Sequence, residues 1–482
     1  MVNLIVYILL FSIYTNILFF ENANGLNWLL YSIPLLILSI VTLIKNKKIK
    51  KKSGLLFIIP ILVLSASIFL YNNVFTKFNV VIIPILFLMM YVYTIRPTFR
   101  LKELLLDLIR LIFKKLYPSY IRNFFNLVSL KMKRLKVKKE FKKRLLSVII
   151  VIPIVLIIMA LLVTADMQFK NLFGFIFDSF KDFSILKLFI RIVLITIMFI
   201  FFGSFLNYLS YGYPNEDSPE ESKFRIEPFT IKLLLVVLNV IYIVFDVIQV
   251  QSLFLHQVGS GIVYSEYART GFFQLMFVSV INIGILLISK RSKKECLSIK
   301  NLSALMVALT AVIICSSFFR MYMYDTAYGY TVLRLIVYAT LITEAVLLIP
   351  TLFYIYNSKV KILKHYLIIC LFAYTLMNVY SIDKIIAKNN IDRYDRTNKI
   401  DVVYLAVDLS YDDIPELVEF YSKVDDETIK SDIKDLVCDK YADEDRSIVY
   451  KWLYREDKNI FEYNYSRNKA YKLFDKFECN KK

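Results

Sequence analysis

Long uninterrupted apolar runs are the feature that most constrains how this chain folds. A helix needs about 20 mostly apolar residues to cross a bilayer. Eleven segments meet this requirement, approximately 2–20, 26–44, 53–71, 74–95, 145–165, 185–208, 229–252, 269–289, 301–319, 331–356 and 361–380. Charged residues make up 21% of the chain, below the roughly 25% of soluble domains. The sequence therefore predicts an all-α, polytopic integral membrane protein and argues against a soluble enzyme.

The distribution of Lys and Arg predicts the orientation in the membrane. Basic residues crowd three connections, with six lysines in 45–52, sixteen Lys and Arg in 96–144 and five in 290–300. Other connections, 21–25, 71–73 and 253–268, have none. Cytoplasmic loops carry the basic excess of membrane proteins. We therefore expect a cytoplasmic N-terminus and an extracytoplasmic C-terminus, and we assign the net charge of +20 to these loops rather than to nucleic-acid binding.

The same patterns divide the chain into four parts. We expect four transmembrane helices in 1–95, a basic cytoplasmic or interfacial segment in 96–144, a seven-helix core in 145–380 and an extracytoplasmic helical domain in 381–482. Apolar residues in 101–112 recur at helical spacing beside Lys and Arg, which is typical of an amphipathic helix lying on anionic lipid. Docking of a cytoplasmic protein is the alternative role for that segment.

The last hundred residues differ from the rest in composition. Residues 381–482 hold 19 Lys and Arg against 23 Asp and Glu, and long apolar runs are absent. Ser410 and Asp413 indicate a helix start, and apolar residues from Ile414 onward follow one helical face. Cys438 and Cys479 are the cysteines of this segment. On an oxidising side of the membrane they can form a disulfide, and the alternative is that both remain free thiols.

Common catalytic and cofactor motifs are missing from the sequence. Neither histidine lies in a zinc-ligand spacing, and no CxxC pair, Walker A loop, GxGxxG or GxSxG sequence occurs. We therefore expect no cofactor and no metal, and we have no catalytic residue to nominate.

Charged residues inside apolar segments are candidates for function, because they are expensive to place in a membrane. Arg191 and Asp246 lie at similar predicted depths on consecutive spans, and we expect them to pair. Glu344 falls near the middle of its span. It either takes part in a proton or cation relay or forms a buried hydrogen bond with Thr340 or Thr343.

A polar cluster is predicted at the outer ends of the later spans. Glu266 and Arg269 open the eighth span, Arg320 closes the ninth, Asp325 follows in a loop and Arg334 opens the tenth. Tyrosines accompany these charges, among them Tyr264 and Tyr267. Arg and Tyr together can bind phosphate, carboxylate or sugar groups. The alternative is structural, with the cluster holding helices together and seating the C-terminal domain.

Several motifs resemble those of an uncharacterised bacterial multi-pass membrane family, domain of unknown function 4173, related to 4153. They are Tyr264–Leu275, Thr331–Leu335, Asn390–Tyr394, Tyr404–Leu417 and Asn464–Arg467. The resemblance covers roughly 200–482. It implies a membrane location and carries no catalytic residue over to this chain.

Three classes of function fit these features. The first is a permease-like or envelope-associated protein that binds an anionic or sugar-bearing ligand, such as cell-wall material, at its outer face. The second is a structural or regulatory membrane subunit without a ligand. The third, which the absence of an evident acid–base pair makes the weakest, is a membrane enzyme acting on lipid-linked or cell-wall material.

Overall fold

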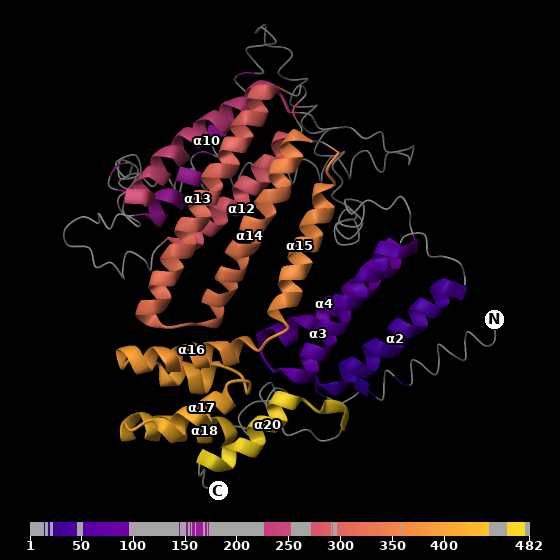
Figure 1. Ribbon diagram of the computed structural model, residues 1–482, viewed down its shortest axis with the longest axis vertical. Helices are drawn as coiled ribbons and strands as arrows, with labels where there is room; N and C mark the ends of the chain where they lie inside the picture. The colour runs from indigo at the N-terminus through magenta and orange to yellow at the C-terminus, as the bar shows by residue number, and fades with distance from the viewer. Residues whose placement is uncertain are drawn as a thin grey trace, which may run out of the picture. The chain divides into compact units, whose positions relative to one another are not determined.

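The computed structural model describes residues 23–45, 52–95, 226–251, 271–290, 296–357, 359–442 and 460–477, with Ser292 and scattered positions in 14–19 and 144–172. Every named element in these ranges is a helix (Figure 1). The predicted basic helix of 96–144 and the predicted spans 2–20 and 185–208 lie outside the described residues, apart from a few positions.

The chain forms two compact units. The first combines 1–99, 328–339 and 368–482, and the second combines 100–327 and 340–367. The helices that precede the C-terminal domain in the described part of the chain are α2 (Leu26–Lys45), η1 (Lys52–Phe57), α3 (Ile58–Leu70), α4 (Val74–Ile95), α10 (Pro228–Gln249), α12 (Phe272–Ser289), α13 (Leu297–Tyr328), α14 (Val332–Tyr356) and α15 (Ile362–Met377). The C-terminal domain, residues 381–482, contains α16 (Ile382–Thr397), η3 (Tyr404–Asp408), α17 (Ile414–Lys423), α18 (Glu427–Ala442), η5 (Ile460–Glu462), α20 (Tyr465–Phe474) and η6 (Asp475–Phe477).

Several helices are apolar and long enough to cross a membrane. Among the described residues these are α10, α12, α13 and α14, or five spans if α15 and α16, which meet at a 62° bend, are counted as one. The chain is therefore a multi-pass membrane protein, but the predicted count of eleven spans is not supported. Segment 53–71 consists of η1 followed directly by the 13-residue α3.

The second unit buries polar side chains and exposes apolar ones. Phe277, Ile349 and Phe353 are more than half exposed, whereas the buried face of α13 includes Ser303 and Thr310. This distribution is the reverse of that in a water-soluble bundle. It suits helices whose outer surface contacts lipid and whose contacts use small and polar residues.

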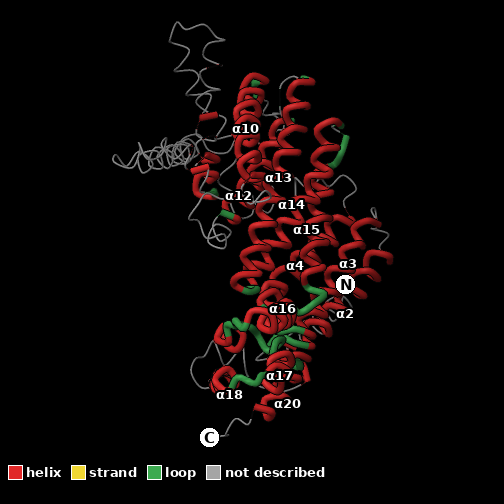
Figure 2. Tube along the Cα trace, turned by 60° about the vertical axis from the view of Figure 1, so that its left-hand side comes forward, coloured by secondary structure: helices red, strands yellow, loops and turns green. Residues whose placement is uncertain are grey.

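The helices of the C-terminal domain, which Figure 2 shows grouped together, pack around an apolar core that also includes Phe75 of α4. Ile414 and Leu417 of α17 are fully buried there together with Ile433 of α18 and Phe477 of η6. The predicted start at Ser410 is wrong, because α17 begins at Ile414 after Asp413. The Ser410 backbone N–H instead donates to Asp383, which holds the preceding turn.

Within the first unit, the C-terminal domain is hydrogen-bonded to the ends of the membrane helices. The N–H of Leu26 donates to the Tyr463 carbonyl (2.9 Å), and the Asn464 amide donates to the Ile68 and Tyr71 carbonyls (2.9 Å each). These helix ends adjoin the connections 21–25 and 71–73, which have no basic residues.

Candidate functional site

Buried polar side chains on α10, α12 and α14 lie near one another in the second unit. On α10, Asp246 and Tyr242 are four residues apart and share one helix face. The Tyr242 hydroxyl donates to Asn282 of α12 (2.6 Å). One turn before Asn282, the Ser279 hydroxyl donates to the Glu344 carboxylate of α14. We call these five residues the polar row.

The two acids at the ends of the polar row lack full hydrogen bonding. Within the described part of the chain, neither oxygen of Asp246 has a hydrogen-bond partner, and Glu344 uses one oxygen of two. Asp246 is 6% exposed and Glu344 is 3% exposed. A buried polar group without a partner is destabilising. Such groups inside apolar helices are therefore candidates for proton or cation binding.

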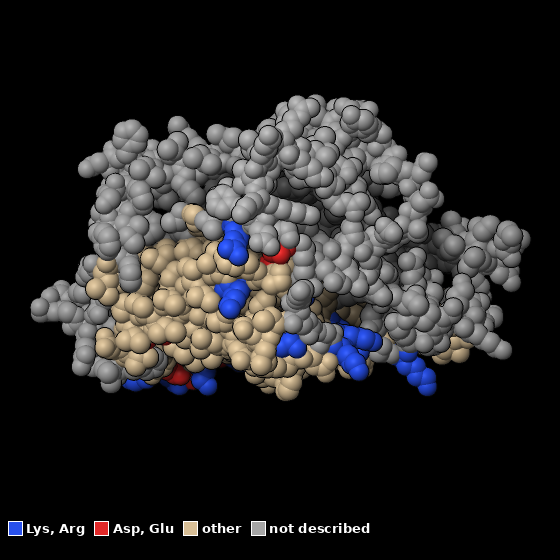
Figure 3. Space-filling model, turned by 90° about the horizontal axis from the view of Figure 1, so that it is seen from above, with Lys and Arg blue, Asp and Glu red and all other residues tan. Residues whose placement is uncertain are grey.

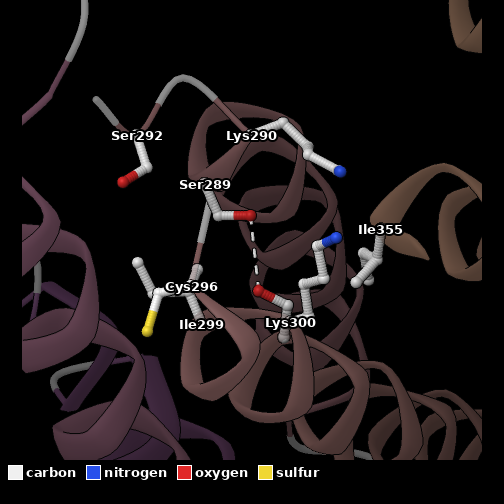
Figure 4. Close-up of a pocket in the computed structure, with 8 residues that line it drawn as sticks. Ser289, Lys290, Ser292, Cys296, Ile299, Lys300 and Ile355 are labelled. Atoms are coloured by element: carbon white, nitrogen blue, oxygen red, sulfur yellow. Dashed lines mark hydrogen bonds between the residues drawn. The ribbon is translucent and has the colours of Figure 1, made fainter. Parts of the chain in front are cut away.

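A second polar contact lies at the C-terminal end of α12, close to the start of α13 (Figure 4). The Ser303 hydroxyl donates to Ser289 (3.3 Å) beside a pocket of about 20 Å³ lined by Lys290 and Lys300. A volume of this size holds about one water. Leu286, which is fully buried, lies between Asn282 and Ser289 in the sequence of α12.

Lysines mark this end of the second unit. Figure 3 views the molecule from the end at which α13 begins, and Lys and Arg side chains stand out in blue among its described residues. Lys290 ends α12 and Lys300 lies in the first turn of α13, while Lys359 and Lys361 follow α14. The basic residues therefore gather where the sequence predicts the cytoplasmic face.

A different arrangement is found toward the C-terminal end of α13, where Arg320 is fully paired. It bonds Asp166 at 2.5 Å with both side chains 0% exposed. It also donates to the Ala165 carbonyl (2.7 Å) and to the Gln249 side chain of α10 (2.8 Å), and the Gln249 amide donates to Asp166 (2.8 Å). We call Arg320, Asp166, Gln249 and Ala165 the arginine cluster. Because every partner is supplied by the chain itself, it acts as a lock between helices.

Gly271 allows the backbone to approach this cluster closely. Its φ is +95°, and a Cβ placed there would lie 1.9 Å from the Ala165 carbonyl oxygen. Beside it, the Ser317 hydroxyl of α13 donates to the Phe272 carbonyl (3.1 Å). The start of α12 is thus held against residue 165 and α13.

The structure describes three residues of the predicted outer cluster. Arg320 and Asp325 both lie on α13 and are fully buried. The prediction that Asp325 lies in a loop is wrong, because α13 continues to Tyr328. Arg320, which was predicted to close the ninth span, lies within α13 and is paired with Asp166. The remaining predicted residues lie outside the described ranges, namely Tyr264, Glu266, Tyr267 and Arg269.

Arg334 lies in the first turn of α14, as predicted. Its guanidinium donates to the Gly329 carbonyl. The turn is clasped by Asn390 of α16, which accepts from the Tyr330 N–H (2.8 Å) and donates to the Tyr330 carbonyl (2.9 Å). These contacts connect the start of α14 to the C-terminal domain, and the predicted role of Arg334 in ligand binding stays a prediction.

The predicted pair of Arg191 and Asp246 cannot be described, since Arg191 lies outside the described residues. The prediction that Glu344 lies near the middle of its helix is confirmed. Sequence reasoning missed Gln249, Asn282 and Ser279 because it searched for charges alone. It missed Asp166 because that residue directly follows the predicted span 145–165. A usable signal was present, since Ser303, Thr310 and Ser317 recur every seven residues along α13, as expected for a polar stripe on one helix face.

Asp412 forms a third polar junction, within the first unit. Its carboxylate accepts from the Asn72 N–H (2.8 Å) and from the Ser381 hydroxyl (2.6 Å), which caps α16. Burial raises the pKa of Asp412 to about 6, against the opposing effect of these hydrogen bonds and one from Ser466. One carboxyl thus joins the α3–α4 connection, α16 and α20.

No group of three or more metal-ligating side chains occurs among the residues that the structure describes. A family model described as "Domain of unknown function (DUF4153)" matches residues 58–420. The match is to the 4153 family rather than to its relative 4173, and it excludes the motif near Asn464. No curated protein and no solved structure matches the chain.

Proposed function

The chain belongs to the DUF4153 family, and since that description assigns no activity, we propose from the geometry that it is a permease-like membrane protein of the cell envelope. In this proposal the polar row moves a proton or a cation through the second unit. An anionic or sugar-bearing ligand binds at the outer face.

The observation that carries the proposal is that, among the described residues, neither oxygen of Asp246 and only one oxygen of Glu344 has a hydrogen-bond partner. Asp246 lies near the C-terminal end of α10, whereas Glu344 lies halfway along α14. Between them, Tyr242 is hydrogen-bonded to Asn282, and Ser279 is hydrogen-bonded to Glu344. Each carboxyl can therefore take up a proton or contact a cation without breaking a bond to a fixed partner.

We place the C-terminal domain outside the cytoplasm. The basic loop pattern supports this orientation, and so do the hydrogen bonds between this domain and the lysine-free connection at Asn72. Cys438 is disulfide-bonded, and disulfides persist in oxidising compartments. After reduction, an impermeant thiol reagent should label Cys438 on intact cells and give less labelling of Cys438→Ser. Equal labelling of the two would contradict this orientation.

Proton movement can be tested on the full chain in liposomes that contain a pH-sensitive dye. A potassium diffusion potential should drive proton flux above that of empty liposomes. Asp246→Asn and Glu344→Gln should each abolish it, because the neutral amides bind no proton. Glu416→Gln is the matched control, since it makes the same change in the C-terminal domain, where Glu416 pairs with Lys384 (3.4 Å).

Flux that persists in both row variants excludes the polar row as the path. The same assay with sodium or potassium in place of the proton gradient separates a cation path from a proton path. If the wild type matches empty liposomes for all three ions, the transport proposal is dropped.

A structural or regulatory subunit is the second candidate, and the arginine cluster favours it. Arg320, which the sequence suggested as a ligand residue, has its partners within the chain. If all of the outer cluster behaves in this way, removal of its charges changes stability alone. The Lys variants Arg269→Lys and Arg334→Lys distinguish the two, because Lys keeps the charge but not the bidentate fork that binds phosphate or carboxylate.

A further inference from the structure

An open groove of about 880 Å³ lies on the C-terminal domain. Its walls come from α17, α18, α20 and η6, which belong to the first unit and lie together in Figures 1 and 2. The volume is within the roughly 300–1,000 Å³ of small-molecule sites. The residues lining it are Pro415, Val418, Glu419, Tyr421, Ser422, Lys430, Lys469, Leu473 and Lys476.

Three lysines give the groove a positive charge. Lys469 and Lys476 are exposed and seven residues apart, and neither forms an ion pair in the part of the chain that the structure describes. Lys430 lies 3.8 Å from Glu427. The acidic lining residue Glu419 is held by Lys423 at 2.6 Å, so it does not neutralise the groove lysines. Lys469 and Lys476 stand out in a domain with an excess of acidic residues.

The groove also offers an apolar surface. Val418 and Leu473 line it and belong to or pack against the domain core. One face of the Tyr421 ring is occupied by Lys430, whose Nζ lies 5.7 Å from the ring centroid. The surface available to a ligand beside the lysines is therefore mainly aliphatic, which favours a flexible apolar chain over a stacked ring.

We propose that this groove binds an anionic amphiphile, with a phosphate-bearing head on Lys469, Lys476 and Lys430 and an apolar chain over Val418 and Leu473. Lysine binds phosphate as a point charge, and the groove's size suits one such molecule. The inference deepens the proposed function by giving the anionic ligand a site that does not involve Arg269 or Arg334. It does not depend on the polar row.

Calorimetry on the purified full chain tests the groove with two soluble probes, geranyl diphosphate and inorganic pyrophosphate. Geranyl diphosphate should bind at least about tenfold more tightly, since its chain adds apolar contact. Lys469→Gln with Lys476→Gln should weaken both probes by roughly tenfold or more. Lys472→Gln, on the same helix but outside the groove, should leave both affinities unchanged.

Three results would overturn the proposal: no binding of geranyl diphosphate, equal affinity for the two probes, or equal losses in the groove and Lys472 variants. Binding of anionic-lipid vesicles without binding of the soluble probe would assign the lysines to a membrane surface instead. Proton flux in liposomes is measured separately, so failure of this site and failure of the polar row are distinguishable.

Discussion

The arginine cluster and the polar row are both buried in the second unit, yet they treat charge in opposite ways. In the cluster, Arg320 has a carboxylate, an amide and a carbonyl within hydrogen-bond distance. In the row, Asp246 has no hydrogen-bond partner among the described residues. A buried pair whose geometry is complete holds structure, while a buried acid left unsatisfied is a candidate for chemistry. Whether a buried charged residue has hydrogen-bond partners therefore distinguishes a structural role from a candidate functional one better than its presence does.

The largest effect is expected from breaking the arginine cluster. Arg320→Gln should lower the free energy of unfolding by about 3–5 kcal/mol, because Asp166 is left as an unmatched buried charge. The thermal midpoint of the purified protein in detergent measures this. Combining it with Asp166→Asn should cost less than the sum of the two single changes. Additive losses would show that Arg320 and Asp166 do not act as a pair.

A somewhat smaller loss is expected at the backbone contact beside the cluster. Gly271→Ala should destabilise the protein by roughly 2–4 kcal/mol, through left-handed strain and a clash with the Ala165 carbonyl. Gly284→Ala, on the same helix with open space around it, is the control and should be neutral or slightly stabilising. Equal thermal midpoints for the two variants would contradict the close approach.

Asp412 gives a pH-dependent contrast. Its pKa of about 6 in the folded protein lies above its ordinary value, so protonation favours the folded state. Its contribution is complete below about pH 4 and is lost as pH rises through 6, a difference of up to about 3 kcal/mol. Thermal midpoints from pH 4 to 8 should therefore fall more steeply in the wild type than in Asp412→Asn. The exposed Asp408→Asn should follow the wild type, and parallel curves for all three would refute the assignment.

The smallest effect on stability is expected from the polar row. Asp246→Asn should change the free energy of unfolding by about 1 kcal/mol or less, or raise it, because it removes a buried carboxyl that has no hydrogen-bond partner among the described residues. The same thermal assay applies. A loss as large as that of Arg320→Gln would place Asp246 in the scaffold and remove the distinction between the two regions.

Much of the fold follows from apolar runs, and the fine division of those runs does not. The runs at α10, α12, α13 and α14 predicted their helices to within a few residues, except at the C-terminal end of α13. There Arg320 and Asp325 were taken as signs of water, but a buried charge with a partner 154 residues away in sequence cannot be told from an exposed one by local pattern.

The site was predictable only in part. Asp246 and Glu344 were found because isolated acids in apolar helices are rare. Their neighbours Ser279 and Asn282 escaped notice, since small polar residues are common in membrane helices and only the three-dimensional row gives them meaning. The lysine groove depends on helices α17, α18 and α20 coming together, and no sequence window contains it.

Asn282 at the centre of the polar row has a consequence for speed. A chain of hydroxyl groups can pass protons along by exchanging donor and acceptor roles, but a carboxamide holds its hydrogens and relays none. The amide thus acts as an insulator between Asp246 and Glu344. Any proton that travels between them needs an inserted water or a rearrangement of the helices. If protons move along this row, as proposed, they do so stepwise, at the pace of a carrier rather than of an open channel.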